Sequence, residues 1–302
     1  MSGPTPSVGR EGDRAAVRSL VFDDVIATYL VDGVLTMRPD KFFPDVPLEY
    51  WSQRPDLLTG DGGIAMSAGG LLVELSDTKL LVDAGLGALT MDSDIGSADS
   101  GSMIDVLAAL GRKPEDIDVL AFTHLHFDHA GWAFADGAKT FPNARYVLAA
   151  KEWAPYAHGE RGTDPTTPWH VISALAADPV VTFVEDGDIV VPGVHAVVTP
   201  GHSPGHTSYV ITSHTGRRLV ALGDAFHTTA QLAHPDWLSV ADSDVAGVAA
   251  ARRRLLAELA EPNTVGFAFH FGDQPFGRAI GEPTGGAIWE PVPTVALAGP
   301  PR

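Results

Sequence analysis

The segment Thr123-His124-Leu125-His126-Phe127-Asp128-His129 places three imidazoles and one carboxylate within six consecutive positions. Neither a hydrophobic core nor a turn requires such a cluster, whereas both groups are common metal ligands. Alternation along an extended chain places His124 and His126 on the same side. The chain must then turn for Asp128 and His129 to reach an adjacent position, so the segment predicts two neighbouring metal ions.

The composition narrows the chemistry of such a site and of its partners. The 302 residues include no cysteine, which excludes disulfides, a thiolate nucleophile and iron–sulfur clusters, so a metal must use imidazole and carboxylate. The formal net charge of −18 disfavours nucleic acid, because phosphate binding requires a basic surface. A small-molecule substrate is therefore expected.

The N-terminal residues bear on where the protein resides. Residues 1–18 are polar and lack the apolar core of a signal peptide, and no later run has the length of a membrane span. The sequence predicts a cytoplasmic protein with no membrane partner.

The order of strand-like and helical runs predicts one domain. Residues 1–17 are expected to form a flexible tail, and residues 18–302 a single domain with lid-like segments at about 39–63 and 151–170. Strands are expected at 20–30, 33–37, 70–75, 79–83, 119–123 and 264–269, and an amphipathic helix at 244–260 with Arg252 to Arg254 largely solvated. The Gly- and Pro-rich residues 272–302 are expected to be mostly irregular.

Four further metal-competent side chains stand where apolar strands end. Asp83 follows the run 80–82, His202 lies in the turn 199–206, Asp224 follows the run 219–222, and His270 follows the run 267–269. Loops at strand ends gather into active sites, so we expect these residues to join the histidine-rich segment.

These pieces, in this order over about residues 65–270, resemble the metallo-β-lactamase fold hydrolases. The resemblance implies an αβ/βα four-layer sandwich, with two mixed β-sheets flanked by helices. It also implies that one metal is held by His124, His126 and His202, that the other is held by Asp128, His129 and His270, and that Asp224 bridges them. The cofactors would be two divalent ions, with zinc favoured and iron or manganese as alternatives. Asp83 would orient a metal-bound histidine, and His206 would either support a metal ligand or be structural.

The surroundings of the bridging position refine this resemblance. The stretch Gly223-Asp224-Ala225-Phe226-His227 resembles the branch that contains methyl parathion hydrolase-like enzymes and lactonases. Lactonases of this fold commonly carry a tyrosine three residues after the bridging aspartate, where this chain has His227. The side chain could assist catalysis by contacting the carbonyl or protonating the leaving oxygen, or it could be hydrogen-bonded into the loop, and both interpretations stay open.

The predicted function is hydrolysis of an ester-like bond. A hydroxide held between two metals would attack a lactone or carboxylic ester, with Asp128 or His227 assisting proton transfer and phosphotriesters as promiscuous substrates. Two alternatives use the same motif: a thioesterase or cyclase of polyketide-type biosynthesis, and a mononuclear iron persulfide dioxygenase. Aromatic residues in or beside the lid-like segments predict a partly apolar substrate, and the apolar stretch 42–51 could equally form a homodimer contact.

Overall fold

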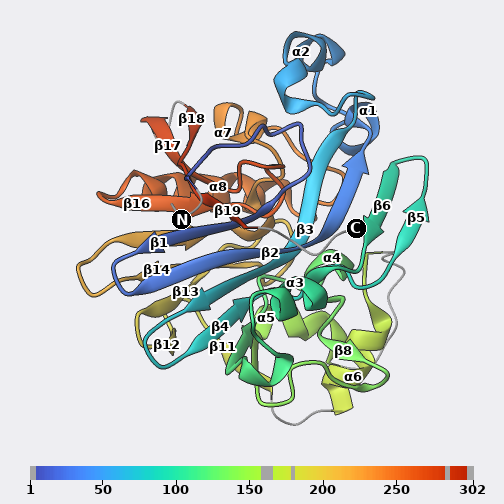
Figure 1. The fold of residues 1–302 in the computed structure, drawn as a ribbon. Coiled ribbons are helices and arrows are strands. Elements are labelled where there is room, and N and C mark those ends of the chain that lie inside the picture. The colour runs from blue at the N-terminus through green and yellow to red at the C-terminus, as the bar shows by residue number, and fades with distance from the viewer. Residues whose placement is uncertain (1–4, 158–165, 178–180, 283–285, 298–302) are drawn as a thin grey trace.

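Two β-sheets dominate the computed structural model, which describes residues 5–157, 166–177, 181–282 and 286–297 (Figure 1). The larger sheet has ten strands: β1 (Val17–Phe22), β2 (Val25–Met37), β3 (Ile64–Glu74), β4 (Lys79–Val82), β5 (Thr90–Asp92), β6 (Gly96–Ser100), β7 (Val119–Ala121), β10 (Arg145–Ala149), β11 (Val181–Val184) and β19 (Val295–Leu297). The smaller sheet has seven: β12 (Ile189–Val191), β13 (Val194–Val198), β14 (Thr207–Thr212), β15 (Arg218–Ala221), β16 (Thr264–Phe267), β17 (Phe276–Glu282) and β18 (Gly286–Pro291). A separate hairpin joins β8 (Phe134–Ala135) and β9 (Ala138–Lys139).

The helices are short except for one. They are α1 (Pro39–Phe42), α2 (Leu48–Gln53), α3 (Met103–Ala109), α4 (Phe127–Ala130), α5 (Ala150–Trp153), α6 (Trp169–Ala177), α7 (Ala230–Ala233) and α8 (Val245–Ala260), with the 3₁₀ turns η1 (Pro55–Leu57), η2 (Pro114–Asp116), η3 (Ala154–Tyr156) and η4 (Gly223–Ala225). Among the described residues, no helix is long and apolar enough to cross a membrane.

The two sheets pack face to face, and alternation along the strands explains how. In β15, Leu219 and Ala221 belong to the core between the sheets, whereas Val220 faces the apolar side of α8. Tyr29 of β2 meets Phe267 of β16 across the sheets, with ring centroids 5.2 Å apart. The predicted fold class, an α/β sandwich of two mixed sheets with helices, is confirmed.

Parallel pairs of strands bring the candidate site together. In the larger sheet β4 runs parallel to β7, and in the smaller sheet β15 runs parallel to β16. Their carboxyl ends lead to Asp83, His124, Asp224 and His270 respectively. The strand-end pattern in the sequence therefore corresponds to one edge of the sandwich.

Two predicted stretches of secondary structure are wrong. The break expected after residue 30 lies instead at Asp23, which has a positive φ of 52°, and β2 continues through Asp32 with a bulge between Val31 and Gly33. Residues 272–302, expected to be mostly irregular, contribute β17, β18 and β19. Glycine is required there for packing, since a Cβ on Gly277 would lie 2.3 Å from the Trp289 ring.

Residues 5–16, within the segment predicted as a tail, pack along the domain. Ser7 forms a β-bridge with Thr294, and the buried Glu11 accepts hydrogen bonds from the Thr229 backbone at 2.9 Å and the Thr228 hydroxyl at 3.0 Å. Thr228 and Thr229 directly follow His227, so this segment supports the loop that carries a candidate site residue.

The buried Glu11 carboxyl predicts a pH-dependent contribution to stability. Burial raises the pKa of Glu11 above its ordinary value of 4.5. The folded state then binds the proton more tightly than the unfolded state, so stability present below pH 4.5 is lost as the pH rises through the folded pKa. We expect Glu11→Gln to gain stability relative to the parent as the pH rises over that window, measured by urea unfolding. The exposed Glu49→Gln is the control, and parallel curves for Glu11→Gln and the parent would contradict the prediction.

Candidate metal centre

The first histidines of the site are placed by the end of β7 and the start of α4. After Ala121 the chain stays extended through His126, which has φ −73° and ψ 159°, and then enters α4. Asp128 and His129 therefore lie in the first turn of a helix, facing a different direction from His124 and His126. The predicted turn between the two pairs is thus supplied by a helix.

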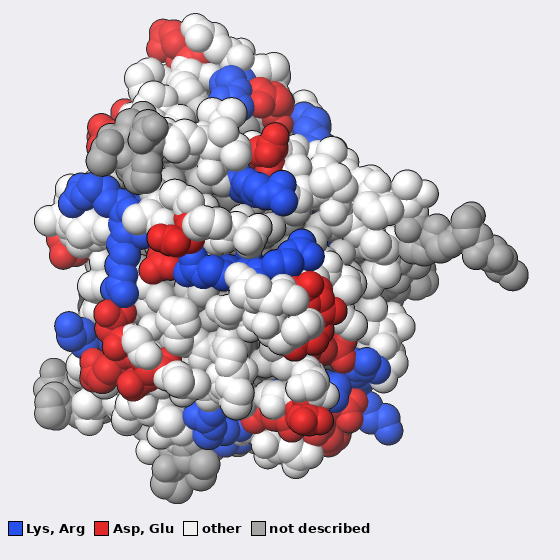
Figure 2. Space-filling view, turned by 90° about the vertical axis from the view of Figure 1, so that its left-hand side faces the viewer, with Lys and Arg blue, Asp and Glu red and all other residues white. Residues whose placement is uncertain are grey.

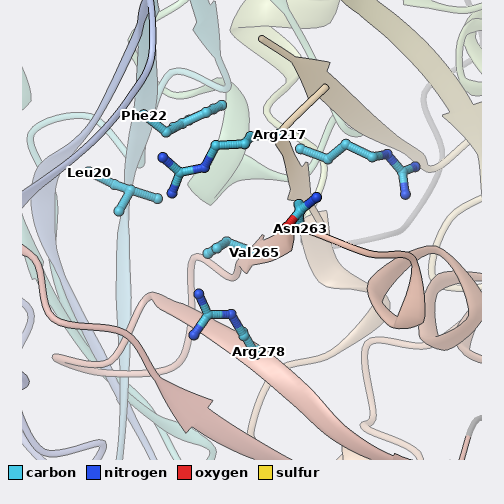
Figure 3. Close-up of a pocket in the computed structure, with 7 residues that line it drawn as sticks. Leu20, Phe22, Arg217, Asn263, Val265 and Arg278 are labelled. Carbon is cyan, nitrogen blue, oxygen red and sulfur yellow. The ribbon is translucent and has the colours of Figure 1, made fainter. Parts of the chain in front are cut away.

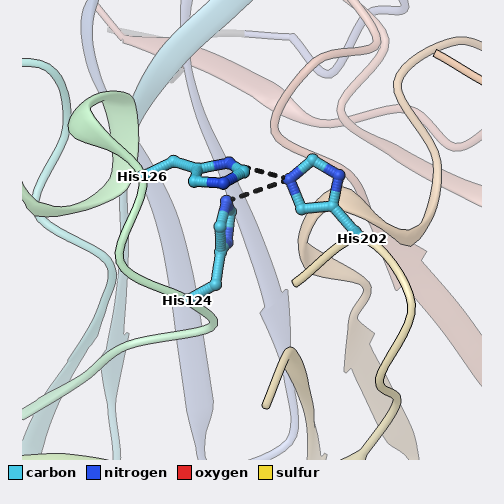
Figure 4. Close-up of side chains that lie close together, drawn as sticks. All are labelled: His124, His126 and His202. Carbon is cyan, nitrogen blue, oxygen red and sulfur yellow. Dashed lines mark hydrogen bonds between the residues drawn. The ribbon is translucent and has the colours of Figure 1, made fainter. Parts of the chain in front are cut away.

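One group consists of His124, His126 and His202, whose rings converge (Figure 4). The Nε2 atom of His202 lies 3.2 Å from Nε2 of His124 and 3.0 Å from Nδ1 of His126. Burial lowers the pKa of His124 well below its ordinary value and lowers the pKa of His126 to about 3. The rings are therefore neutral, the form that offers a lone pair to a metal.

A second group combines Asp128, His129, Asp224 and His270. Nε2 of His129 and Nε2 of His270 each lie 3.1 Å from Oδ1 of Asp224. Both nitrogens also lie 3.6 Å from Oδ2 of Asp128. Two carboxylates and two imidazoles thus converge on one position.

Asp224 connects the two groups. It lies in η4 shortly after β15, where glycine is required at position 223 because φ is 58° and because a Cβ there would lie 2.4 Å from Nε2 of His206. While Oδ1 of Asp224 faces the second group, Oδ2 lies 3.6 Å from Nε2 of His202 and 3.9 Å from Nε2 of His124. One carboxylate therefore borders both positions.

Buried polar atoms without hydrogen bonds show that these residues fit metal ions. Nε2 of His129 and Oδ1 of Asp224 are buried with no hydrogen-bond partner of suitable geometry, although 3.1 Å separates them. Buried polar atoms are almost always satisfied, so such atoms call for another partner. The donor set of imidazole nitrogens and carboxylate oxygens is the set that divalent zinc, iron or manganese accepts.

Three of the site histidines, His129, His202 and His270, are each oriented through their second ring nitrogen. Nδ1 of His129 lies 2.8 Å from Asp83, Nδ1 of His270 donates to the carbonyl of Ser67 at 2.9 Å, and Nδ1 of His202 lies 3.1 Å from Asp242. Such partners fix the ring and raise its basicity as a ligand. Asp83 takes the orienting position that the sequence predicts.

The remaining histidines lie elsewhere or support the site. His206 Nε2 accepts the backbone N–H of Asp224 at 2.9 Å, so it positions the bridging loop. His170, His195, His214 and His234 belong to neither group, and His158 lies outside the described residues.

His227 lies beside both groups, with its ring buried. Its Nε2 atom is 3.4 Å from Oδ2 of Asp224, and neither ring nitrogen has a hydrogen bond. Only its backbone N–H is tied into the loop, by Gln231 Oε1 at 2.7 Å. With His202 and Asp224 it also forms a third group of metal-competent atoms.

Aromatic side chains of the first lid-like segment border His227. The rings of Phe42 and Phe43 lie 5.4 Å and 6.4 Å from it, and Trp51 packs on Phe43 at 5.6 Å. Trp132 instead donates its indole N–H to the buried Asp32 at 2.9 Å. The second lid-like segment is described only up to residue 157 and from residue 166.

Three buried charged residues support the site, and the sequence reasoning missed them. Glu152 accepts from the Leu125 N–H, the Ser203 hydroxyl and the Gly205 N–H at 2.7–3.0 Å, which ties the two histidine loops together. Asp242 contacts His202, and Arg252 lies 3.5 Å from Asp242. The expectation that Arg252 is largely solvated is wrong, since the residue is 0% exposed.

Removing the charge on Asp242 should weaken metal binding. In Asp242→Asn, His202 loses the carboxylate that holds its Nδ1–H. We expect metal affinity to fall roughly 10–100-fold, measured by competition with a chromophoric chelator, with far-UV circular dichroism unchanged. The exposed Asp105→Asn serves as the charge-matched control. Equal affinity in Asp242→Asn and the control would show that Asp242 does not act on the site.

Comparisons with known proteins agree with this geometry. The family model of the metallo-beta-lactamase superfamily matches residues 71–264, more than half of the chain. An N-acyl homoserine lactonase from Bacillus cereus is 30% identical to this chain over 126 residues. The matched region is 42% of this chain and 45% of the lactonase. N-acyl homoserine lactonase AttM from Rhizobium radiobacter is 25% identical over 61% of this chain and 66% of its own length. The chain thus spans a little under half the length of the Bacillus relatives it matches.

Solved structures match over nearly the whole chain. The dizinc quorum-quenching lactonase AidC has a TM-score of 0.78 at 22% identity, covering 93% of this chain and 98% of AidC. The hydrolase AbOPH of the beta lactamase superfamily has a TM-score of 0.76 at 25% identity. The match covers 92% of this chain and 98% of AbOPH. At 22% identity, the likeness to AidC shows the fold.

Proposed function

This chain belongs to the metallo-beta-lactamase superfamily, and we propose that it is a dinuclear metal-dependent hydrolase that opens a lactone or carboxylic ester. The position of Asp224 carries the proposal. Its two oxygens border two separate groups of converging ligand atoms, so one carboxylate would hold a pair of ions side by side. His124, His126 and His202 would hold the first ion, and Asp128, His129 and His270 the second.

Two ions at these positions, zinc in our proposal, would supply a nucleophile by lowering the pKa of a water and would polarise the carbonyl under attack. The chain's own residues would then orient and transfer protons. Asp128 is the least buried residue of the group that it forms with His129, Asp224 and His270. Its Oδ2 would accept a proton from the attacking water. His227, with both ring nitrogens without hydrogen bonds, would donate to the leaving oxygen.

Two observations favour a lactone with an apolar portion. The relatives matched at 30% identity are N-acyl homoserine lactonases. Phe42, Phe43 and Trp51 pack beside His227, so the surroundings of this part of the site are apolar, as suits a substrate with an acyl chain. Phosphotriesters would be promiscuous substrates of the same geometry.

The test is metal analysis combined with a substrate panel. We expect two divalent ions per chain and hydrolysis of lactones or aryl esters that stops when a chelator removes the metal. One iron per chain with consumption of oxygen would favour the persulfide dioxygenase, and turnover restricted to acyl thioesters would favour the thioesterase or cyclase. Either result would overturn the proposal.

Replacing His227 distinguishes a role in proton transfer from a role as a metal ligand. In a catalytic role, His227→Ala should lower kcat roughly 100-fold or more while two ions stay bound, because general acid catalysis is lost. Loss of an ion would instead identify His227 as a ligand within its group with His202 and Asp224. The partly exposed His234→Ala is the control. Unchanged kinetics would remove His227 from the mechanism.

A further inference from the structure

A small cavity lies at the end of β15 and β16 that is opposite to the metal centre (Figure 3). Its residues come from β1, from the starts of β15 and β16, and from β17, whereas Asp224 and His270 follow the ends of β15 and β16. The cavity has a volume of about 60 Å³ and is lined by Leu20, Phe22, Arg217, Arg218, Asn263, Val265 and Arg278. It belongs to neither group of metal-competent residues.

The lining is cationic in a protein that is strongly acidic overall. Three of the chain's 20 Lys and Arg residues line this one cavity, and none of its 38 Asp and Glu residues does. Figure 2 views the side of the molecule where β16 and the turn between β1 and β2 lie, and Lys and Arg side chains cross the middle of that face with Asp and Glu side chains beside them. A cavity lining that carries positive charge alone favours an anionic ligand.

Two of the three guanidinium groups form no ion pair among the described residues. Arg218 forms an ion pair with the Glu258 carboxylate. Its guanidinium also donates a hydrogen bond to the backbone carbonyl of Glu258 at 3.2 Å. In the described part of the chain, no ion pair involves Arg217 or Arg278. The Arg217 guanidinium lies 6.0 Å from the Phe22 ring centroid, a contact that holds the charge at the cavity.

Two carboxylates come near these arginines. Asp23 accepts hydrogen bonds from the hydroxyls of Thr215 and Ser213, and these bonds together with the nearby Arg217 lower the pKa of its carboxyl. Glu290 stands opposite Arg278 in the register of β17 and β18, without an ion pair between them. Neither carboxylate lines the cavity.

We propose that this cavity binds a phosphate group. The heads of Arg217 and Arg278 lie on either side of Val265 and would both contact one oxyanion. The planar guanidinium matches the geometry of phosphate oxygens, and two positive charges outside ion pairs suit a dianion better than a carboxylate. A volume of 60 Å³ holds a few water-sized atoms, since one water needs roughly 10–15 Å³, and this is the size of a phosphate.

The site would also join the two sheets. Leu20 and Phe22 belong to the larger sheet, whereas Arg218, Val265 and Arg278 belong to the smaller sheet. A ligand bound to the folded state alone raises its stability by mass action. Phosphate should therefore raise the thermal midpoint of the protein, at an end of the sandwich away from the metal centre.

The experiment titrates inorganic phosphate into the metal-loaded protein at constant ionic strength, by calorimetry and thermal shift. We expect saturable binding and a rising Tm in the parent, with acetate much weaker. Arg278→Gln and Arg217→Gln should each weaken the affinity by about tenfold, because each loses a charge-assisted contact. Arg254→Gln, an exposed arginine paired with Asp186, should leave it unchanged.

Phosphate can also bind metal ions, so the comparison of variants decides the outcome. Equal affinities in Arg278→Gln, Arg217→Gln and the parent would overturn the proposal, as would the absence of saturable binding. Methyl phosphate distinguishes the sources of the ligand. If methyl phosphate binds at least as tightly as inorganic phosphate, the ligand is the phosphate group of a monoester. If methyl phosphate binds more weakly, the ligand is free phosphate.

Discussion

Asp224→Ala should lose both metal ions and reduce hydrolysis more than any other single change in the site. The side chain borders both groups, with Oδ1 at 3.1 Å from two imidazoles and Oδ2 at 3.6 Å from a third. Removing an outer partner of a ligand costs 10–100-fold in affinity or activity, so removing a shared ligand should cost more than about a hundredfold. Metal stoichiometry after gel filtration and lactone turnover are the measurements.

The fold of this variant must be intact for the result to be informative. Asp224→Asn keeps the size of the side chain and one coordinating oxygen, and should retain more metal than Asp224→Ala. Similar near-UV circular dichroism spectra would exclude a folding defect. Two tightly bound ions in Asp224→Ala would contradict the proposed bridging role.

Arg252→Met should produce the largest loss of stability. The buried guanidinium donates to the carbonyls of Ala225 at 2.7 Å and Pro235 at 2.9 Å, and lies 3.5 Å from Asp242. Burial lowers the pKa of Arg252 to about 10, so it stays charged at neutral pH. The substitution leaves Asp242 buried without its cation and should cost about 3–5 kcal/mol. Urea unfolding of the two proteins measures the difference.

Arg253→Met is the matched control, because the neighbouring arginine on α8 is exposed. Its free energy of unfolding should stay within about 0.5 kcal/mol of the parent. Because Arg252 also holds the loop of Asp224 through Ala225, its loss should weaken metal binding as well. Equal stability in the two variants would refute the role assigned to Arg252.

The strand-end pattern anticipated where the metal-competent residues lie. Parallel strands end at the same edge of a sheet, so polar residues after apolar runs had to meet, and Asp83, His124, Asp224 and His270 do. The family resemblance added the pairing of the two sheets. The first inference needed only local sequence and chain order, and the second needed the known fold of the family that the motifs resemble.

The supporting residues were harder to anticipate, because their partners are distant in sequence. Glu152 is a single glutamate whose three donors lie 27 to 53 residues away. Arg252 did carry a signal: together with Val248, Leu255 and Leu259 it lies on one helical stripe, at the spacing of buried positions. The run of three arginines suggested a solvated face, yet successive helical residues point in different directions.

The strands of the C-terminal residues could not be predicted from composition. The Trp289 ring packs against Gly277 of the same segment and against Gly266 of β16, a long-range fit that the local sequence does not encode. The same holds for the turn at Asp23, where an aspartate rather than a glycine takes the left-handed conformation.

Each group of converging ligands draws on both sheets, and this sets an order of events during synthesis. His124 and His126 emerge from the ribosome 78 and 76 residues before His202, and His270 emerges later still. A nascent chain therefore exposes a partial set of imidazoles long before either position is complete. Capture of the proposed ions would therefore be a late maturation step, and truncated translation products would be unable to complete it.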